Sequence, residues 1–348
     1  MHLEQENQAQ QHKRRVRYKG KYPKKFEEKY KELQPEKYQD TVQHVIRKGN
    51  TPAGMHISIM VKEILDFLQI QPGETGFDAT LGYGGHTKAM LECLHGSGHM
   101  YATDVDPEES AKTKKRLEEL GYGEDILSIR LQNFCTIDEI AKEVGGFDFI
   151  LADLGVSSMQ IDNPKRGFSF KVDGPLDLRL NQEKGISAAE RLDTISREEL
   201  AGMLPYCEEL AKAITEEIRR GNRIDTTTKL RGVIEKALDF LPEKEKQETV
   251  KKTCQRTFQA LRIDVNHEFE VLYEFMEKLP GALKPGGRVA ILTFHSGEDR
   301  LVKQALKEGY REGIYSDYAK DVIRPSAQEC AQNGRARSTK MRWAVRAE

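Results

Sequence analysis

The stretch Asp78-Ala-Thr-Leu-Gly-Tyr-Gly-Gly-His-Thr87, with Thr103-Asp-Val-Asp-Pro107 after it, decides the fold class of this chain. The first stretch is typical of a strand, a glycine-rich turn and the start of a helix, and the second of a strand that ends in an acid. Asp104, at the tip of that second strand, could accept hydrogen bonds from ribose hydroxyls. Three residues without a Cβ let the turn pass close to a ligand: Gly82, Gly84 and Gly85. The sequence therefore predicts a site for a cofactor that contains adenosine.

The spacing of the glycines discriminates among adenosine cofactors. The dinucleotide fingerprint G-x-G-x-x-G would need a glycine at position 87, where this chain has Thr87, and no Gly-Lys-Ser/Thr of a P-loop follows the turn. A compact Gly-x-Gly-Gly turn followed by Asp104 favours S-adenosylmethionine over NAD or ATP. The alternative is an ordinary strand-to-helix turn, but the acid at the expected distance favours the cofactor site.

Composition places the chain among globular proteins. Its 348 residues are 38% hydrophobic and 32% charged, which is enough for about two domains with buried cores. The sequence contains no run of 18 apolar residues, so we expect no membrane-spanning helix. The first 30 residues are polar, which argues against a secretory signal. The cysteines form no C-x-x-C pair, which favours a reduced cytoplasmic compartment and argues against a bound metal: Cys93, Cys135, Cys207, Cys254 and Cys330.

The net charge of −1 conceals an uneven distribution of charge. Residues 1–50 contain 13 Lys and Arg against 7 Asp and Glu, and residues 333–342 are also basic. Basic segments of this kind attract phosphate backbones, although solvated tails have the same composition. We predict that residues 1–55 form a basic, flexible extension with a short helix near 26–33.

Periodicity predicts the architecture of the remaining chain. Strands alternate with helices up to about residue 160, which indicates a doubly wound α/β layer; the strands are expected at 77–81, 100–104, 126–131 and 147–154. A polar, helical pattern then continues to about 255, with helices at 188–193, 197–204, 208–219 and 227–238. Strands resume at 288–294 and 341–345. We therefore predict a discontinuous domain (56–160 and 256–348) that contains a helical insertion (161–255).

Three polar residues mark the predicted functional edge of the sheet. Asp104, Asp153 and His295 all fall at the carboxyl ends of predicted parallel strands, where ligands bind in open α/β sheets. Each has a simpler explanation, since Asp153 could cap a turn and His295 could be a hydrogen-bonded residue at a strand end. Their coincidence with the glycine turn favours a shared site.

Seven motifs, in order along the chain, resemble those of the bacterial small-subunit rRNA (cytosine-N4)-methyltransferase family, known as RsmH or MraW. They are residues 78–86, 104–107, 153–162, 166–170, 174–179, 256–263 and 294–300, and the resemblance extends over roughly 55–348. It implies a Rossmann-like S-adenosylmethionine-dependent methyltransferase with an inserted helical domain. The cofactor-binding positions that it implies are Gly82, Gly84, Gly85, His86, Asp104, Phe134, Asp153 and Gln160.

The resemblance also implies a reaction and a partner. The expected substrate is the exocyclic N4 of a cytosine in 16S rRNA of the small ribosomal subunit, near the decoding site, and the enzyme would be a monomer or a homodimer. Asp153 is expected to orient the amine and His295 to handle a proton or contact the base. Residues expected nearer the RNA are Arg166, Arg179, Arg256, Arg262 and Asn266.

The chain departs from the family pattern at a few positions. The family usually has Leu at 297 and Gly at 207, where this chain has Gly297 and Cys207, and methionines where it has Leu178 and Leu180. These changes leave two alternatives open. One is a non-catalytic RNA-binding or ribosome-assembly factor on the same fold, and the other is a methyltransferase with a different RNA target.

Overall fold

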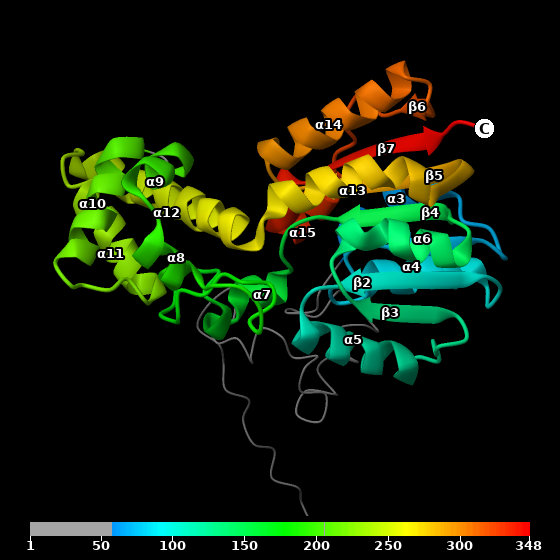
Figure 1. Cartoon of the computed structure of the whole chain (residues 1–348), viewed down its shortest axis with the longest axis horizontal. Helices are drawn as coiled ribbons and strands as arrows, with labels where there is room; N and C mark the ends of the chain where they lie inside the picture. The colour runs from blue at the N-terminus through cyan, green and yellow to red at the C-terminus, as the bar shows by residue number, and fades with distance from the viewer. Residues whose placement is uncertain (1–57, 205) are drawn as a thin grey trace, which may run out of the picture. The chain divides into compact units, whose positions relative to one another are not determined.

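A computed structural model describes residues 58–204 and 206–348, which belong to the second of two compact units, His56–Glu348. This unit contains a seven-stranded sheet, in the order β3-β2-β1-β4-β5-β7-β6, with the helices α8 to α12 to one side of it (Figure 1). The predicted basic extension and its short helix lie outside the described residues. Among the described helices, none is long and apolar enough to cross a membrane.

The sheet combines a parallel layer with an antiparallel edge. The strands β1 to β5 pair in parallel, whereas β7 runs antiparallel between β5 and β6. The strand order reverses between β1 and β4, and ligands bind at such a switch point in open α/β sheets. The strands are β1 Thr75–Asp78, β2 His99–Asp104, β3 Leu127–Leu131, β4 Phe147–Asp153, β5 Leu283–Thr293, β6 Tyr315–Tyr318 and β7 Lys340–Arg346.

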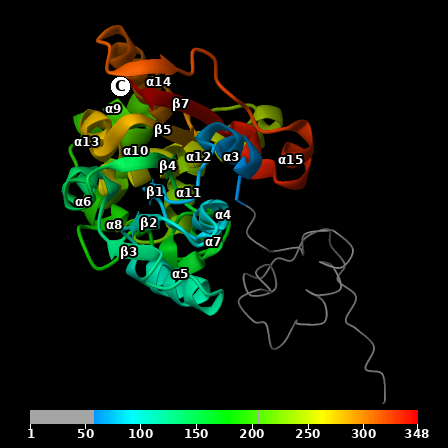
Figure 2. The ribbon, with the colours of Figure 1, turned by 90° about the vertical axis from the view of Figure 1, so that its right-hand side faces the viewer.

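Helices cover both faces of the sheet, which explains why the middle of β4, residues 149–152, is a continuous apolar run. Phe149 and Leu151 pack with the helices of one face, and Ile150 and Ala152 with those of the other. Figure 2 shows α3 and α4 on one side of the sheet and α6 and α13 on the other. The first face carries α3 Val61–Leu68, α4 Gly85–Leu94 and α5 Pro107–Glu119; the second carries α6 Ile137–Val144, α13 Glu268–Ala282 and α14 Ser296–Arg311.

The helices α8 to α12 form a cluster with its own hydrophobic core, separate from the two cores beside the sheet. Capping boxes fix the starts of two of them, since the Ser187 and Ser196 hydroxyls accept hydrogen bonds from the third helical amide. The bounds are α8 Ala188–Thr194, α9 Arg197–Met203, α10 Cys207–Arg219, α11 Thr227–Ala237 and α12 Glu243–Asn266. Shorter elements are η2 Phe134–Thr136, α7 Ser158–Asp162, η3 Pro164–Arg166, α15 Ala327–Gln332 and η4 Gly334–Ser338.

The predicted α/β class is confirmed, and so are the parallel strands that end at Asp104, Asp153 and near His295. Two details of the prediction are wrong. The first strand ends at Asp78, because the Asp78 carboxylate accepts a hydrogen bond from the Thr80 amide and turns the chain. The strand β6 was not predicted, because it is short and mostly polar. The helix α12 runs through residue 256, at which the second part of the predicted discontinuous domain begins.

Gly76 in β1 offers a test of how tightly the sheet packs on its helices. A Cβ at this position would overlap the ring of Phe149 and lie 2.5 Å from Sδ of Met100, and both side chains are fully buried. We expect Gly76→Ala to lower the free energy of unfolding by about 1–3 kcal/mol through overpacking. Gly232→Ala in α11, where a Cβ meets nothing within 4 Å, should raise it by roughly 0.5–1 kcal/mol. Urea denaturation of both variants tests this, and a neutral Gly76→Ala would contradict it.

Candidate functional site

The glycine turn is held by the acid that the sequence predicts to bind ribose. Asp104 Oδ2 accepts a hydrogen bond from the Gly82 amide at 2.8 Å, and Oδ1 accepts one from the Asp106 amide at 2.9 Å. The turn and the end of β2 are therefore one unit. A Cβ at Gly82 would meet only a carbonyl oxygen 3.8 Å away, so the turn leaves room beside this carboxylate.

The helix α5 fixes the other side of the turn. The Thr113 hydroxyl donates to the Gly82 carbonyl at 2.6 Å, and Arg116 donates to the Tyr83 carbonyl at 2.7 Å. The Arg116 guanidinium also lies over the Tyr83 ring, 3.6 Å from its centroid. Gly84 caps α4 with φ +81°, and a Cβ there would lie 2.7 Å from the Thr113 methyl group. The sequence analysis did not predict that Thr113 and Arg116 bind the turn. Their i, i+3 spacing, which places both on one face of α5, is the one feature of the sequence that could have indicated it.

Thr87, the residue that departs from the dinucleotide fingerprint, has a structural role. Its hydroxyl donates to Asp78 Oδ2 at 2.6 Å, and both side chains are buried. Burial raises the pKa of Asp78, and the bonds from Thr87 and the Thr80 amide oppose that shift. Asp78 therefore connects the end of β1 to the first turn of α4, beneath the glycines.

His86 and Asp153 form a pair across the switch point. His86 Nδ1 lies 3.4 Å from Asp153 Oδ2, and Nε2 lies 2.9 Å from the Ile59 carbonyl oxygen. Because Nε2 faces a carbonyl oxygen, it carries a proton, and Nδ1 is the ring nitrogen that faces the Asp153 carboxylate. Asp153 Oδ1 is buried and has no hydrogen-bond partner. A buried carboxylate oxygen without a partner fits a cationic or hydrogen-bonding ligand.

Burial perturbs both predicted cofactor acids in the same direction. It raises the pKa of Asp104 to about 6, against the hydrogen bonds from the Asp106 and Gly82 amides. It also raises the pKa of Asp153 to about 6, where His86 opposes the shift and Asp78 and Glu298 reinforce it. Perturbed acids at the carboxyl edge of a sheet are typical of a functional site.

Asp106 joins the cofactor side of the site to the chain that follows β4. It caps α5, and its Oδ2 accepts hydrogen bonds from Gln160 Nε2 at 2.9 Å and from Arg166 Nη1 at 2.7 Å. Asp106 is 1% exposed and Arg166 is 3% exposed. Arg166 was predicted to contact RNA, but its guanidinium is buried and also donates to the carbonyls of Arg179 and Leu180.

The loop 178–180 is clamped between Arg166 and Asn266. The Asn266 side chain accepts from the Leu180 amide at 2.8 Å and donates to the Leu178 carbonyl at 2.7 Å. Leu178 has φ +64°, a strained conformation for a residue with a branched side chain, and strain of this kind concentrates at functional sites. The amide of Asn266 is therefore fully used within the protein, since it also donates to the Arg262 carbonyl.

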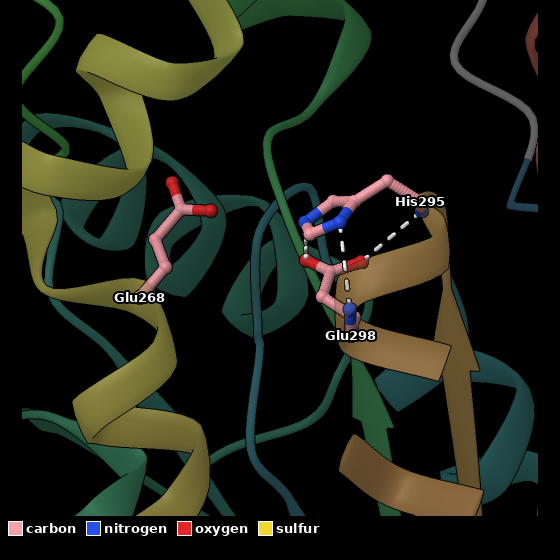
Figure 3. Close-up of side chains that lie close together, drawn as sticks. All are labelled: Glu268, His295 and Glu298. Atoms are coloured by element: carbon pink, nitrogen blue, oxygen red, sulfur yellow. Dashed lines mark hydrogen bonds and ion pairs between the residues drawn. The ribbon is translucent and has the colours of Figure 1, made fainter. Parts of the chain in front are cut away.

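His295 lies at the centre of a polar cluster at the end of β5 (Figure 3). Its Nδ1 accepts from the Glu298 amide at 3.4 Å, and its Nε2 lies 3.1 Å from Glu298 Oε1. Burial alone would raise the pKa of Glu298, but His295, the Phe294 amide and Arg262 hold it below its usual value. Glu298 is therefore a carboxylate that orients the imidazole.

Glu268, His295 and Glu298 offer ligand atoms within 4.8 Å of one another, which sequence reasoning did not predict. However, Arg262 donates to both oxygens of Glu268, at 2.7 and 2.8 Å. Figure 3 shows Glu268 facing the other two residues from α13. The Glu268 carboxylate is therefore paired with Arg262, which was predicted to contact RNA, while His295 and Glu298 form a separate pair beside it.

The remaining predicted residues have different environments. Phe134 is half-buried after β3, with its ring edge-on to Phe275. Arg179 forms a two-pronged pair with Asp177. Arg256 is exposed on α12. In the basic segment 333–342, the prediction of phosphate contact is wrong for Arg342, because it is buried and paired with Asp299 at 2.7 Å.

The fold and the site define a class of protein, the Rossmann-like S-adenosylmethionine-dependent methyltransferases. The chain belongs to the MraW methylase family, whose model matches residues 53–347. The family resemblance and the cofactor predicted from the sequence are therefore confirmed.

The chain is also similar to named relatives over almost its whole length. It is 83% identical to "Ribosomal RNA small subunit methyltransferase H 1" of Agathobacter rectalis, over 98% of this chain and 100% of the relative. It is 69% identical to the protein of the same name from Lachnoclostridium phytofermentans, over 98% and 95%. It is 38% identical to "Ribosomal RNA small subunit methyltransferase H" of a Cyanothece strain, over 85% and 96%. The first two relatives share the N-terminal extension, since their matches cover nearly the whole chain.

The buried Arg166–Asp106 pair gives a prediction on stability. Arg166→Gln leaves a buried carboxylate without its ion-pair partner, which should lower the free energy of unfolding by about 3–5 kcal/mol. Lys112→Gln, which removes exposed ion pairs on the same α5, should cost at most about 1 kcal/mol. Chemical denaturation of both variants tests this. If Arg166→Gln kept wild-type stability and lost only RNA affinity, Arg166 would be an RNA contact instead.

The raised pKa values predict how cofactor binding depends on pH. Acids with a folded pKa of about 6 bind protons more tightly than in the unfolded chain, so their contribution to stability is present at low pH and is lost as pH rises through 6. A ligand that needs Asp104 and Asp153 ionised should therefore bind more weakly below pH 6 and release protons near it. Calorimetry of S-adenosylmethionine binding, in buffers of different ionisation enthalpy, should detect release at pH 6 and none at pH 8. Asp153→Asn should reduce that release, and equal heats in all buffers at pH 6 would contradict the assignment.

Proposed function

We propose that this protein transfers a methyl group from S-adenosylmethionine to the exocyclic N4 of a cytosine in 16S rRNA, near the decoding site. The observation that carries the proposal is the conjunction of full-length similarity to small-subunit rRNA methyltransferases with the unpartnered, buried oxygen of Asp153. The compartment in which the chain meets this RNA would be the cytoplasm.

The residues at the carboxyl edge fit the cofactor. Asp104 would accept hydrogen bonds from the ribose hydroxyls, and Phe134 would flank the adenine. Gly84, Gly85 and His86 would lie along the methionine end. Asp153 Oδ1 would accept a hydrogen bond there, and Gln160 would complete the site from α7 while it braces Asp106. The bound cofactor supplies a methyl group on a positively charged sulfur.

The protein must orient a weak nucleophile. The N4 lone pair of cytosine is delocalised into the ring, so the amine has to be held in line with the methyl carbon. As N4 gains the methyl group and the carbon–sulfur bond breaks, N4 must lose one proton. Asp153 is our first candidate to hold the amine, because it lies at the switch point and its Oδ1, beside the methionine end of the cofactor, has no partner within the protein.

His295 is the second candidate for proton handling. Both of its ring nitrogens face Glu298, so accepting a proton from the substrate would require Nδ1 to exchange its contact with the Glu298 amide. The ionised Glu298 would then stabilise the imidazolium. The target base would reach either residue only after it leaves its stack in the RNA.

RNA contact divides the predicted arginines into two groups. Arg256 is exposed and is the candidate for a phosphate contact, and Arg179 is half-buried within the clamped loop 178–180. We propose that Arg166, Arg262 and Asn266 act indirectly, by holding the loop 178–180 and the start of α13 in place for the substrate. The helical insertion and the basic extension would add phosphate contacts, and for the extension this proposal rests on charge alone.

The substrate assignment predicts the outcome of a deletion. Small-subunit rRNA from a strain that lacks this protein should lose N4-methylcytosine at one position, and expression of the wild-type chain should restore it. Expression of Asp153→Asn should not restore it, although the variant should remain folded. An unchanged level of N4-methylcytosine in the deletion strain would overturn the substrate and leave the cofactor assignment intact. A non-catalytic assembly factor, the alternative left by Gly297 and Cys207, would bind 30S particles yet transfer no labelled methyl group to them.

A further inference from the structure

Phe269 is an aromatic residue that the core of the protein does not use. It lies in the first turn of α13 and is 36% exposed. The apolar residues that follow it on this helix, Leu272, Phe275 and Met276, are buried against the sheet. Most of the Phe269 side chain is covered by the protein, and its exposed part lies beside His295 at the end of β5, where a ligand can contact it.

The ring of Phe269 forms one wall beside His295. The two ring centroids lie 5.8 Å apart with an interplanar angle of 84°, an edge-to-face contact. The residue before it, Glu268, is neutralised by the two-pronged bond from Arg262. The Phe269 ring is therefore an apolar wall, and the neighbouring charge of Glu268 is neutralised by Arg262. The wall stands at the end of β5, where substrate would enter.

Gly297 provides the space that this ring occupies. A Cβ at Gly297 would lie 2.7 Å from Cζ and 3.0 Å from Cε1 of Phe269, and 3.1 Å from Nδ1 of His295. Any other residue at 297 would push the ring away or turn the imidazole. The ring of Phe269 therefore occupies the space that a side chain at position 297 would need.

We infer that Phe269 is a positioning residue that stacks on a base of the RNA substrate beside His295, and that Gly297 is required to admit its ring. This inference rests on the proposed function, because it takes single-stranded RNA as the occupant. Aromatic rings stack on any base, which suits a site that must stabilise a base outside its helix. The edge of His295 would then face the same base.

Substitutions at Phe269 test the inference. Phe269→Ala should lower the affinity for 30S particles and kcat/KM for methyl transfer by roughly 5- to 150-fold, the range expected for loss of one stacked base. Phe269→Trp should retain both, whereas Phe269→Leu, which keeps apolar volume without an aromatic face, should lose them. S-adenosylmethionine affinity should stay at the wild-type value in all three variants, which also shows that the site remains folded. Tyr310→Ala, which removes an aromatic residue that is 40% exposed at the far end of α14, is the matched control and should leave RNA affinity unchanged.

A double-mutant cycle tests the claim that Gly297 is required to admit the ring of Phe269. Gly297→Leu should lower 30S affinity as far as Phe269→Ala does, and the double variant should be no worse than either single one, because both act through one ring. Wild-type affinity in Phe269→Ala, or equal activity of Phe269→Leu and Phe269→Trp, would overturn the inference. Because 30S affinity is measured without turnover, the stacking role can be judged even if the wild-type protein proves to methylate no cytosine N4.

Discussion

The buried ion pair between Asp106 and Arg166 is the interaction on which the two sides of the site depend. Asp106 follows the predicted ribose acid by two residues and donates its amide to it. Arg166 holds the loop 178–180 in place, because its guanidinium donates hydrogen bonds to the carbonyls of Arg179 and Leu180. Neither charge could be left alone at this depth, because an unpaired buried ion costs several kcal/mol. The position of the cofactor acid and that of the substrate-side loop are therefore fixed together.

The other acids at the carboxyl ends of the strands are also affected by burial. Burial raises the pKa values of Asp104 and Asp153, and hydrogen bonds from backbone amides to Asp104 and the contact of Asp153 with His86 only partly offset that rise. A cationic cofactor would supply the missing compensation, so the edge is complete only when it is bound. On the other side, Glu298 is held ionised by its contacts with His295 and neighbouring amides. Acids whose pKa values are pushed apart in this way can take different roles in one reaction.

Several basic residues of the family motifs form ion pairs within the protein, which the sequence did not predict. Arg166, Arg262 and Arg342 each pair with a buried or half-buried carboxylate. Exposed positive charge remains at positions such as Arg256, and the N-terminal extension is basic in sequence. On the proposed function, aromatic groups on a rigid scaffold would suit the target base better than mobile cations, because a base offers a flat π face.

The sequence by itself determined the parallel layer, the glycine turn, the acid at the end of β2 and the identity of the cofactor, because these depend on local periodicity and on glycines that no other residue replaces. It also predicted most helices of the insertion within one or two residues. Only the tertiary structure decided which arginines are buried. An Arg166 at the surface and one paired with an Asp106 sixty positions earlier look alike in a sequence. The match of Phe269 to Gly297 was equally hidden, since a contact between α13 and α14 leaves no periodic signal and depends on the volume of two side chains that only folding brings together.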